Sequence, residues 1–209
     1  MTGPTHYGRA IPAILGWRRH LMATMLAWAE VFERKDPYTA GHVQRVTGFS
    51  LLLGMELQLP QEELTDLWLA AALHDVGKVF VSKAILGKPG PLTAREAEVM
   101  KTHPEIGARI LAGVRGTRRA AGGVRHHHER FDGRGYPDCL QGTEIPLPAR
   151  IIAVADTYDA MTSHRPYRAA LSPLEAAREI TVEAGKQLCP SVVDAFQSLF
   201  DTGRFILAP

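Results

Sequence analysis

The chain has 209 residues and a formal net charge of +2 with histidine neutral; 45% of its residues are hydrophobic and 22% are charged. This composition is that of an ordinary globular domain, which excludes a wholly disordered chain and a nucleic-acid-binding protein with a large basic field. The two cysteines, Cys139 and Cys189, have no CxxC spacing and cannot form a disulfide framework, so we expect a reducing, intracellular setting.

Apolar residues recur every three or four positions along most of the chain, which predicts helix after helix. The expected helices cover residues 17–35, 39–57, 61–74, 93–101, 104–112, 118–127, 148–162, 173–184 and 191–200. Thr93 and Glu96 have the spacing of a capping box, and residues 87–91 and 131–145 are expected loops. Alternating patterns typical of strands are nearly absent, so the fold class is predicted to be all-α.

No internal repeat, low-complexity tract or linker divides the chain. Residues 1–16 contain Gly, Pro and Thr and are expected to form a flexible N-terminal arm, with one domain over residues 17–209. The apolar stretches fall short of the roughly 20 residues that a membrane helix requires. The N-terminal segment also lacks the order of a signal peptide, because its arginine pair follows the small apolar patch. We therefore expect a cytoplasmic protein without a membrane span.

Six of the nine histidines lie at expected helix ends or turns, and several have a carboxylate nearby. The histidines are His42, His74, His103, His126, His127 and His128, and the carboxylates are Asp75, Glu129 and Asp156. Imidazole and carboxylate groups are ligands of iron, manganese, nickel and zinc. One ion needs about four to six ligands, so this set is large enough for more than one ion. The isolated His6, His20 and His164 are interpreted as surface or core residues.

Asp75 is the natural bridging ligand, because its two oxygens can bind two ions about 3.5–4 Å apart, as in two-metal hydrolases. The segment AAALHDVGK at residues 70–78 places His74 and Asp75 at the end of an apolar helix. Gly77 is expected to let the backbone turn, and Lys78 to direct a cation at the same point. A buried aspartate needs a cationic partner, and a metal is one such partner. A His-Asp pair taken alone is also common as a purely structural feature.

Longer motifs add a resemblance. HDVGK at residues 74–78 resembles the signature of the HD phosphohydrolase superfamily, and HHERFDGRGYP at 127–137 resembles the defining segment of the HD-GYP family of cyclic di-GMP phosphodiesterases. Further segments agree with that family in order: DPYTAGHVQRV at 36–46, ILGKPGPLT at 85–93, HPEIGARIL at 103–111 and IPLPARIIAVADTYDAMTSHRPYR at 145–168. The resemblance covers about residues 31–200. It implies an HD-domain helical bundle of about seven or more helices with a dinuclear metal site in its core, and an HD-GYP domain over residues 17–209.

The resemblance also implies the ligands, all seven of which belong to the set found from the histidines and carboxylates: His42, His74, Asp75, His103, His127, His128 and Asp156. The register of the segment HHE followed by RxDGxGYP selects His127 and His128, so His126 is expected to be structural. Neighbouring side chains on a helix diverge by about 100°, so both can ligate only where the helix ends at the cluster.

One departure from the family pattern concerns the number of metals. Some members hold a third metal with a glutamate four residues before the first histidine, and Tyr38 occupies that position here. Tyrosine, with a pKa of about 10, is a poor ligand at neutral pH. We therefore expect two divalent ions, iron or manganese in preference to nickel or zinc.

The resemblance implies substrate contacts as well. Lys78 matches the family lysine that contacts the scissile phosphate, so Asp75 and Lys78 are the expected catalytic residues. Asp159, Arg165 and Arg168 fall where family members contact the guanine and phosphate groups of the dinucleotide. Arg168 replaces a lysine of some relatives, which keeps the charge and changes the geometry. A solvated surface position is the alternative for Lys78, and a salt-bridged surface position for the two arginines.

The loop containing Gly133, Gly135, Tyr136 and Pro137 has a different expected role. Its glycines allow positive φ and a tight loop. In the family this loop is associated with the docking of GGDEF domains, which synthesise cyclic di-GMP, so a GGDEF protein is a candidate partner. Plain loop architecture explains the same residues equally well.

The implied function is hydrolysis of the bacterial second messenger cyclic di-GMP in signal transduction, giving linear pGpG and, after a second cut, GMP. A water bridging the metals would attack phosphorus as hydroxide, with Lys78 and the metals neutralising the phosphate oxygens. Two alternatives are open. One is an HD-type phosphohydrolase that acts on another cyclic dinucleotide or nucleotide. The other is a catalytically weak protein that binds cyclic di-GMP or docks a GGDEF domain.

Overall fold

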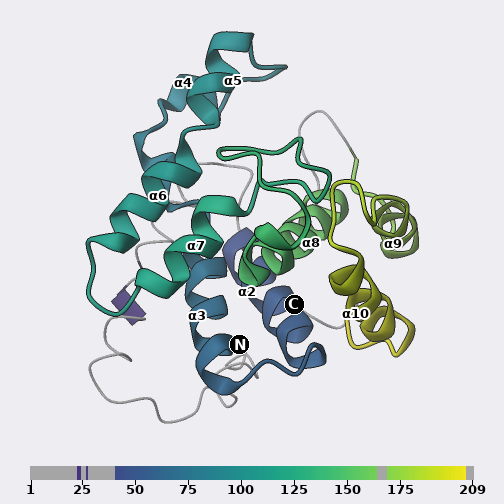
Figure 1. Ribbon diagram of the computed structural model, residues 1–209. Helices are drawn as coiled ribbons and strands as arrows, with labels where there is room; N and C mark the ends of the chain where they lie inside the picture. The colour runs from purple at the N-terminus through teal and green to yellow at the C-terminus, as the bar shows by residue number, and fades with distance from the viewer. Residues whose placement is uncertain (1–22, 25–26, 28–40, 164–168, 206–209) are drawn as a thin grey trace, which may run out of the picture.

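The computed structural model describes residues 23–24, 27, 41–163 and 169–205 (Figure 1). The elements in this part of the chain are α2 (His42–Glu56), α3 (Gln61–Leu73), η2 (Val76–Phe80), α4 (Lys83–Leu86), α5 (Ala94–Met100), α6 (His103–Ala112), α7 (Arg118–His126), η3 (Gly142–Glu144), α8 (Leu147–Thr162), α9 (Pro173–Val182) and α10 (Pro190–Asp201). Extended pairing within the described ranges is limited to one isolated bridge, between Ala184 and Leu188. The predicted all-α fold class is confirmed.

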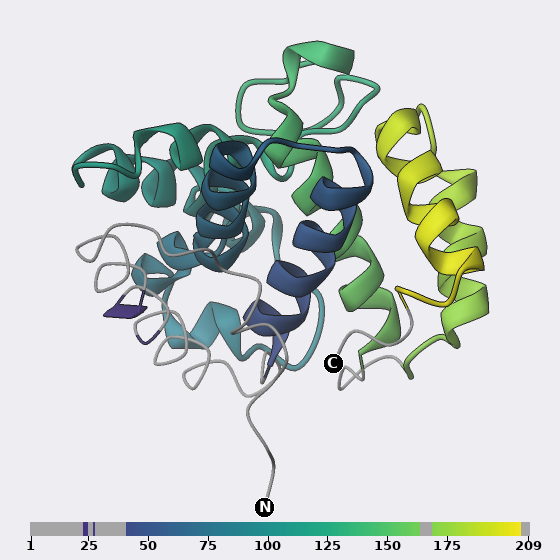
Figure 2. The same cartoon turned by 90° about the horizontal axis from the view of Figure 1, so that it is seen from below.

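Four helices form the centre of the bundle: α2 packs against α3 and α8, and α7 packs against the same two helices (Figure 1). Helix α6 covers α7, while α9 and α10 lie side by side beyond α8 (Figure 2). The core between them is closely packed, and Val46, Leu53, Leu67, Ile152 and Phe196 are fully buried. None of the described helices has both the length and the apolar content that a membrane span requires.

The boundaries of the predicted helices agree closely with the observed ones where capping residues mark the helix ends. Thr93 precedes α5 as the expected capping box: its hydroxyl accepts a hydrogen bond from the Glu96 N–H at 3.3 Å, and the Glu96 carboxylate accepts one from the Thr93 N–H at 2.7 Å. Elements η2, α4 and η3 were not predicted, because three to five residues are too few to show a helical period. The expected arm over residues 1–16 and almost all of the helix expected over 17–35 lie outside the described residues.

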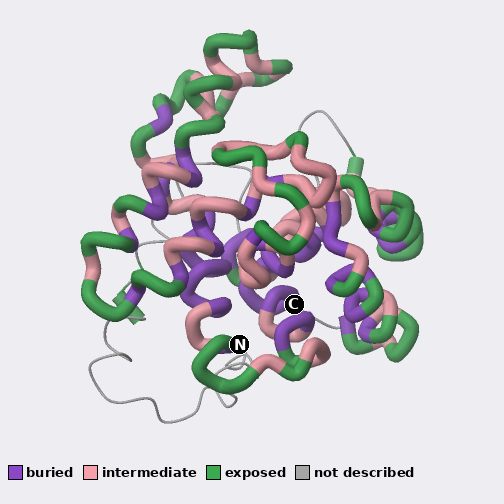
Figure 3. The backbone as a smooth tube through the Cα atoms, viewed as in Figure 1, coloured by how far each residue is buried: buried purple, intermediate pink, exposed green. Residues whose placement is uncertain are grey.

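Helices α4 and α5, with the loop between them, project from the bundle (Figures 1 and 3), and we call residues 83–100 the α4–α5 arm. No residue of α4 or α5 is buried. The Lys88 ammonium lies 2.5 Å from the Glu96 carboxylate and joins the loop to α5. The arm therefore has little contact with the core and presents its side chains to the space beside the bundle.

Gly77 serves close packing between two elements. Its φ lies outside the positive range, so the turn that we expected there does not require a glycine. A Cβ at this position would overlap the carbonyl oxygen of His103 and come within 2.9 Å of the Gly107 nitrogen. The absence of a side chain lets η2 lie against the start of α6, which brings Asp75 beside His103.

Replacing Gly77 with alanine is therefore expected to lower the free energy of unfolding of the metal-free protein by about 1–3 kcal/mol, because η2 must move away from α6. Chemical denaturation followed by circular dichroism measures this change. Gly113→Ala is the matched control, because the nearest atom to a Cβ there is 3.5 Å away. Equal denaturation midpoints for the two variants would contradict the packing role of Gly77.

Candidate metal centre

All seven residues predicted as metal ligands lie in the described part of the chain, and the fold gathers them at one place. Four stand at helix ends: His42 and His103 begin α2 and α6, and His74 and His127 follow the last residues of α3 and α7. Because α7 ends at the cluster, the adjacent His127 and His128 both face it, as the sequence register required. Asp75 follows His74 directly, and Asp156 lies within α8.

Asp75 divides the cluster into two groups. Its Oδ2 lies 3.5 Å from His74 Nε2 and 3.8 Å from His42 Nε2. Its Oδ1 lies 3.2 Å from His103 Nε2 and 4.0 Å from His127 Nε2. His128 joins the group around Oδ1, and Asp156 Oδ1 lies 3.7 Å from His42 Nε2, in the group around Oδ2. Each oxygen thus faces its own pair of imidazoles, which is the arrangement of a carboxylate shared by two ions.

Four imidazoles are fixed in direction by a hydrogen bond from Nδ1, the ring nitrogen that faces away from the cluster. The Nδ1 atoms of three donate at 2.7 Å to the backbone carbonyl three residues earlier: His74 to Ala71, His103 to Met100 and His127 to Val124. His42 Nδ1 donates to a carboxylate instead, at 2.7 Å from Asp159 Oδ2. In the neutral form, a ring whose Nδ1 donates has its lone pair on Nε2, and all four Nε2 atoms face the cluster.

The donor set fits two divalent ions. The Nε2 atoms of His42 and His74 are 3.3 Å apart, and those of His103 and His127 are 3.4 Å apart. Two nitrogens bound to one ion at about 2.1 Å, with an angle of about 90–110°, are separated by about 3.0–3.4 Å. Asp75 Oδ1 is buried and receives no hydrogen bond from the described residues. A bound cation would satisfy these lone pairs.

The pKa values of the buried imidazoles favour the neutral form, which is the ligating form. Burial holds the pKa of His74 below its usual value and that of His127 well below it. Burial, followed by the nearby His103, lowers the pKa of His128 to about 3. These rings are therefore neutral at pH 7.

Asp75 and His42 show the opposite balance, because charged neighbours outweigh burial. Burial raises the pKa of Asp75, but the Lys78 ammonium and the neighbouring His74 hold it well below its usual range. Burial lowers the pKa of His42, but its hydrogen bond to Asp159 and the nearby carboxylates bring it above the usual value. The cluster is therefore set to hold an ionised Asp75 in a mostly buried position.

Asp159 lies behind His42, and it is also among the residues that line the cavity over the cluster. Its carboxylate accepts the hydrogen bond from His42, pairs with the Arg45 guanidinium, and its side chain is only 3% exposed. These two partners lower the pKa of Asp159 against the effect of burial. This setting is that of a carboxylate that orients a histidine of the cluster, and the expected guanine contact of Asp159 stays a prediction. Arg45 was missed in the sequence, although it follows His42 by one helical turn.

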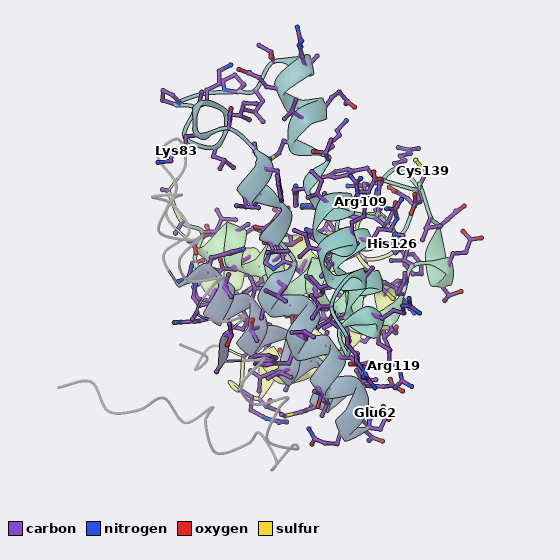
Figure 4. The ribbon with its side chains drawn as sticks, turned by 90° about the vertical axis from the view of Figure 1, so that its left-hand side faces the viewer. Glu62, Lys83, Arg109, Arg119, His126 and Cys139 are labelled. Carbon is purple, nitrogen blue, oxygen red and sulfur yellow. The ribbon has the colours of Figure 1, made fainter. Side chains whose placement is uncertain are left out.

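Lys78 stands at the edge of the cluster. Its Nζ lies 2.5 Å from Asp75 Oδ2, and its side chain is 30% exposed. The other predicted substrate contacts, Arg165 and Arg168, and the departure at Tyr38 lie outside the described residues. His126 points away from the cluster, with Nδ1 3.5 Å from Asp138 Oδ2 and 3.9 Å from Glu129 Oε1, in line with the expected structural role. Figure 4 shows it at the end of α7, near the loop that carries Cys139.

A cavity of about 910 Å³ opens above the cluster. His42, Asp75, His127, His128 and Asp156 line it from the bundle, and Lys78 lies at its side. The α4–α5 arm contributes a largely apolar wall made of Ile85, Leu86, Pro91, Leu92 and Met100. Polar side chains also line the cavity, among them Lys88, Arg130, Thr157 and Gln187. The volume falls within the range of about 300–1,000 Å³ that is typical of small-molecule sites.

The loop after α7 packs closely on the ligand-bearing segment. Gly133 has φ 78°, as the predicted tight loop requires. Gly135 has no positive φ and is needed for another reason: a Cβ there would overlap the backbone of Glu129 and Arg130. The ring of Tyr136 stacks on that of His128, with centroids 5.0 Å apart and an angle of 25° between the planes. The loop therefore contacts the metal centre directly.

Comparisons with known proteins agree with the motifs. The HD domain family model matches residues 27–192. The chain is 40% identical over 174 residues to the cyclic di-GMP phosphodiesterase response regulator RpfG of Xanthomonas campestris, covering 82% of this chain and 46% of that protein. It is 43% identical over 169 residues to a cyclic di-GMP phosphodiesterase of Thermotoga maritima (80% and 46%), and 39% identical over 164 residues to 3'3'-cGAMP-specific phosphodiesterase 3 of Vibrio cholerae (78% and 35%).

Two solved structures share the fold. A cyclic GMP-AMP-specific phosphodiesterase of V. cholerae, V-cGAP3, superposes with a TM-score of 0.69 at 20% identity, covering 88% of this chain and 49% of that one. Bd1817, an HD-GYP-type protein of Bdellovibrio bacteriovorus, gives 0.60 at 18% identity, with 77% and 51% covered. The chain spans less than half the length of the curated relatives named above. The family match and the motifs together show that the chain belongs to the HD domain family, within its HD-GYP branch.

Proposed function

We propose that this domain is a two-metal phosphodiesterase that hydrolyses cyclic di-GMP to linear pGpG, with GMP as the product of a second cut. The observation that carries the proposal is the division of Asp75 between two imidazole groups at the floor of a cavity. Relatives named cyclic di-GMP phosphodiesterases in two organisms, at 40% and 43% identity, support the substrate class. We propose iron or manganese as the resident metal, because a mixed imidazole–carboxylate set suits either ion.

The proposed ligands are the seven predicted residues, described above in two groups that share Asp75. Two divalent ions held by these residues would supply an acidified water and would neutralise charge on the phosphate. The protein holds the ligating rings in one orientation through the carbonyls behind them, so no reorganisation is needed during the reaction. Lys78 directs its ammonium into the cavity beside Asp75, where it would stabilise negative charge developing on the phosphoryl oxygens.

The cavity suits the two chemical parts of a cyclic dinucleotide. Lys78 supplies a cationic group beside Asp75, where a phosphate would lie. The apolar wall of the α4–α5 arm offers flat surfaces on which a base can pack, with Leu86, Pro91 and Met100 among its residues. We propose that one base contacts this wall while the phosphate lies over Asp75.

Product analysis tests the proposal. Protein purified without oxygen and supplied with iron or manganese is incubated with cyclic di-GMP, and the products are separated by chromatography. We expect pGpG to appear, to depend on bound metal and to stop on chelation. Full metal occupancy without turnover would contradict the proposal and favour the binding or GGDEF-docking alternative.

A second candidate substrate is 3'3'-cGAMP, because three relatives from Vibrio cholerae, at 36–39% identity, bear the name of phosphodiesterases specific for it. The two substrates differ in one base, so the metal centre cannot distinguish them and the cavity walls must. The ratio of kcat/KM for the two dinucleotides decides between the candidates.

We propose a cytoplasmic setting, as expected from the two cysteines without CxxC spacing. A GGDEF-domain partner that docks on the loop with Gly133, Gly135, Tyr136 and Pro137 stays a proposal. A pull-down between this domain and a GGDEF protein, repeated with Arg134→Ala in the exposed part of the loop, tests it.

A further inference from the structure

His128 is held differently from the other imidazoles of the cluster. The Nδ1 atoms of His42, His74, His103 and His127 each donate a hydrogen bond that fixes the ring. Among the described residues, none accepts or donates a hydrogen bond with the His128 ring. Its ring contacts are instead with aromatic neighbours: His127 at 4.1 Å, His103 at 5.1 Å and Tyr136 at 5.0 Å between centroids. Tyr136 is the only one of these three that is not itself a proposed ligand.

The ring of Tyr136 is well placed to fix that of His128. The two planes differ by 25°, so the rings are nearly parallel, and the Tyr136 N–H donates to the His128 carbonyl oxygen at 3.3 Å. The Lys101 ammonium lies 5.9 Å from the centre of the tyrosine ring, which connects it to the corner between α5 and α6. Tyr136 therefore lies between His128 and the segment that leads into His103.

A buried carboxylate anchors the loop that carries Tyr136. Glu129 directly follows His128, is 3% exposed, and accepts the Asp138 N–H at 2.7 Å. The backbone N–H groups of Cys139 and Leu140 also bind this carboxylate. Gly135 permits the loop to touch the backbone of Glu129 and Arg130. The ligand-bearing segment thus anchors the loop through Glu129, and the loop places the Tyr136 ring against His128.

We propose that Tyr136 is a positioning residue for His128: the stacked phenol ring keeps the imidazole directed at the ion on the Asp75 Oδ1 side of the cluster. The inference rests on the ligand set of the proposed function and extends it to a residue that was expected to contact a partner protein. Ring stacking replaces the hydrogen bond that orients the other imidazoles, and residues that orient ligands typically contribute about 10-fold to 100-fold to metal affinity.

The test measures the affinities of the two metal equivalents separately. Metal-free wild type and the variants Tyr136→Phe, Tyr136→Trp, Tyr136→Leu and Tyr136→Met are titrated with manganese against a chelating indicator. We expect both ring-bearing variants to resemble wild type. The ringless variants should lose about 10-fold to 100-fold in affinity for one equivalent only, with the other unchanged. Arg134→Ala, an exposed position on the same loop, is the control and should match wild type.

If Tyr136 only held the loop in place, any variant that disturbs its packing would weaken metal binding. Tyr136→Trp, which changes the packing but keeps a ring, would then be affected as well as the ringless variants. Metal affinity is compared with that of wild type for the ringless variant, Tyr136→Leu or Tyr136→Met, whose circular dichroism spectrum shows the full helical content. Ringless variants that bind both equivalents with wild-type affinity would overturn the inference while leaving the proposed function intact. Wild type that binds fewer than two ions would overturn the proposed function itself.

Discussion

Asp75→Ala is expected to remove both metal ions and to reduce turnover of cyclic di-GMP to background. The two oxygens of Asp75 face different imidazole pairs, with Oδ2 3.5 Å from His74 and Oδ1 3.2 Å from His103. A variant without this carboxylate leaves the imidazoles and Asp156 to hold two dications close together, which the mutual repulsion of the dications opposes. Metal content per chain, measured by mass spectrometry on desalted protein, should fall from two to none.

The control for this variant is Asp194→Ala on the exposed side of α10, which should keep two ions and full activity. Tyr38→Phe should likewise have little effect, since no ligand role is assigned to Tyr38. Retention of one ion by Asp75→Ala would show that the carboxylate serves a single metal. Retention of both would refute its role as a ligand.

Lys78→Ala is expected to keep both ions and to lower kcat/KM by about 10²–10³, or roughly 3–4 kcal/mol of transition-state stabilisation. The protonated amine has no lone pair, so it cannot ligate, yet its Nζ lies 2.5 Å from Asp75 Oδ2 at the edge of the cavity. Part of the loss should appear in KM, because the ground-state phosphate is already anionic. Metal content must be measured on the same preparation.

Lys83→Ala provides the matched lysine control. Lys83 is exposed on α4, and Figure 4 shows it at the outer side of the arm. This variant should resemble wild type in both metal content and turnover. If Lys78→Ala also resembles wild type with full metal occupancy, Lys78 is an ordinary surface lysine and the metals are the only phosphate activators left.

The helices that carry the proposed ligands could be predicted because their apolar faces are long and their ends are marked by Gly, Pro or a capping residue. The clustering of His42, His74 and His103 followed from the resemblance, since spacing along the chain does not say which helix ends meet. The structure adds how they meet. Each Nδ1 is fixed by a group behind the ring, and a backbone carbonyl leaves no trace in the sequence because every residue has one.

Other features could not be read from residue type. Gly77 and Gly135 suggested turns, whereas the structure uses both for close contact between backbones: Gly77 with His103 in a distant segment, and Gly135 with Glu129 and Arg130 at the start of its own loop. Asp159 was expected beside the substrate because the family resemblance implies a guanine contact there. The resemblance did not indicate its partners within the protein: the Asp159 carboxylate pairs with Arg45 and accepts a hydrogen bond from His42.

The α4–α5 arm has a consequence for how substrate choice can change. It forms one wall of the cavity, yet neither of its helices has a buried residue, and its own internal link is the pair Lys88–Glu96. Substitutions in Ile85, Leu86 or Leu92 therefore alter the surface that we propose to meet a base without removing side chains from the hydrophobic core. On the proposed function, changes in the arm would alter the choice of dinucleotide while the packing of the bundle, and with it the positions of the candidate ligands, stays the same.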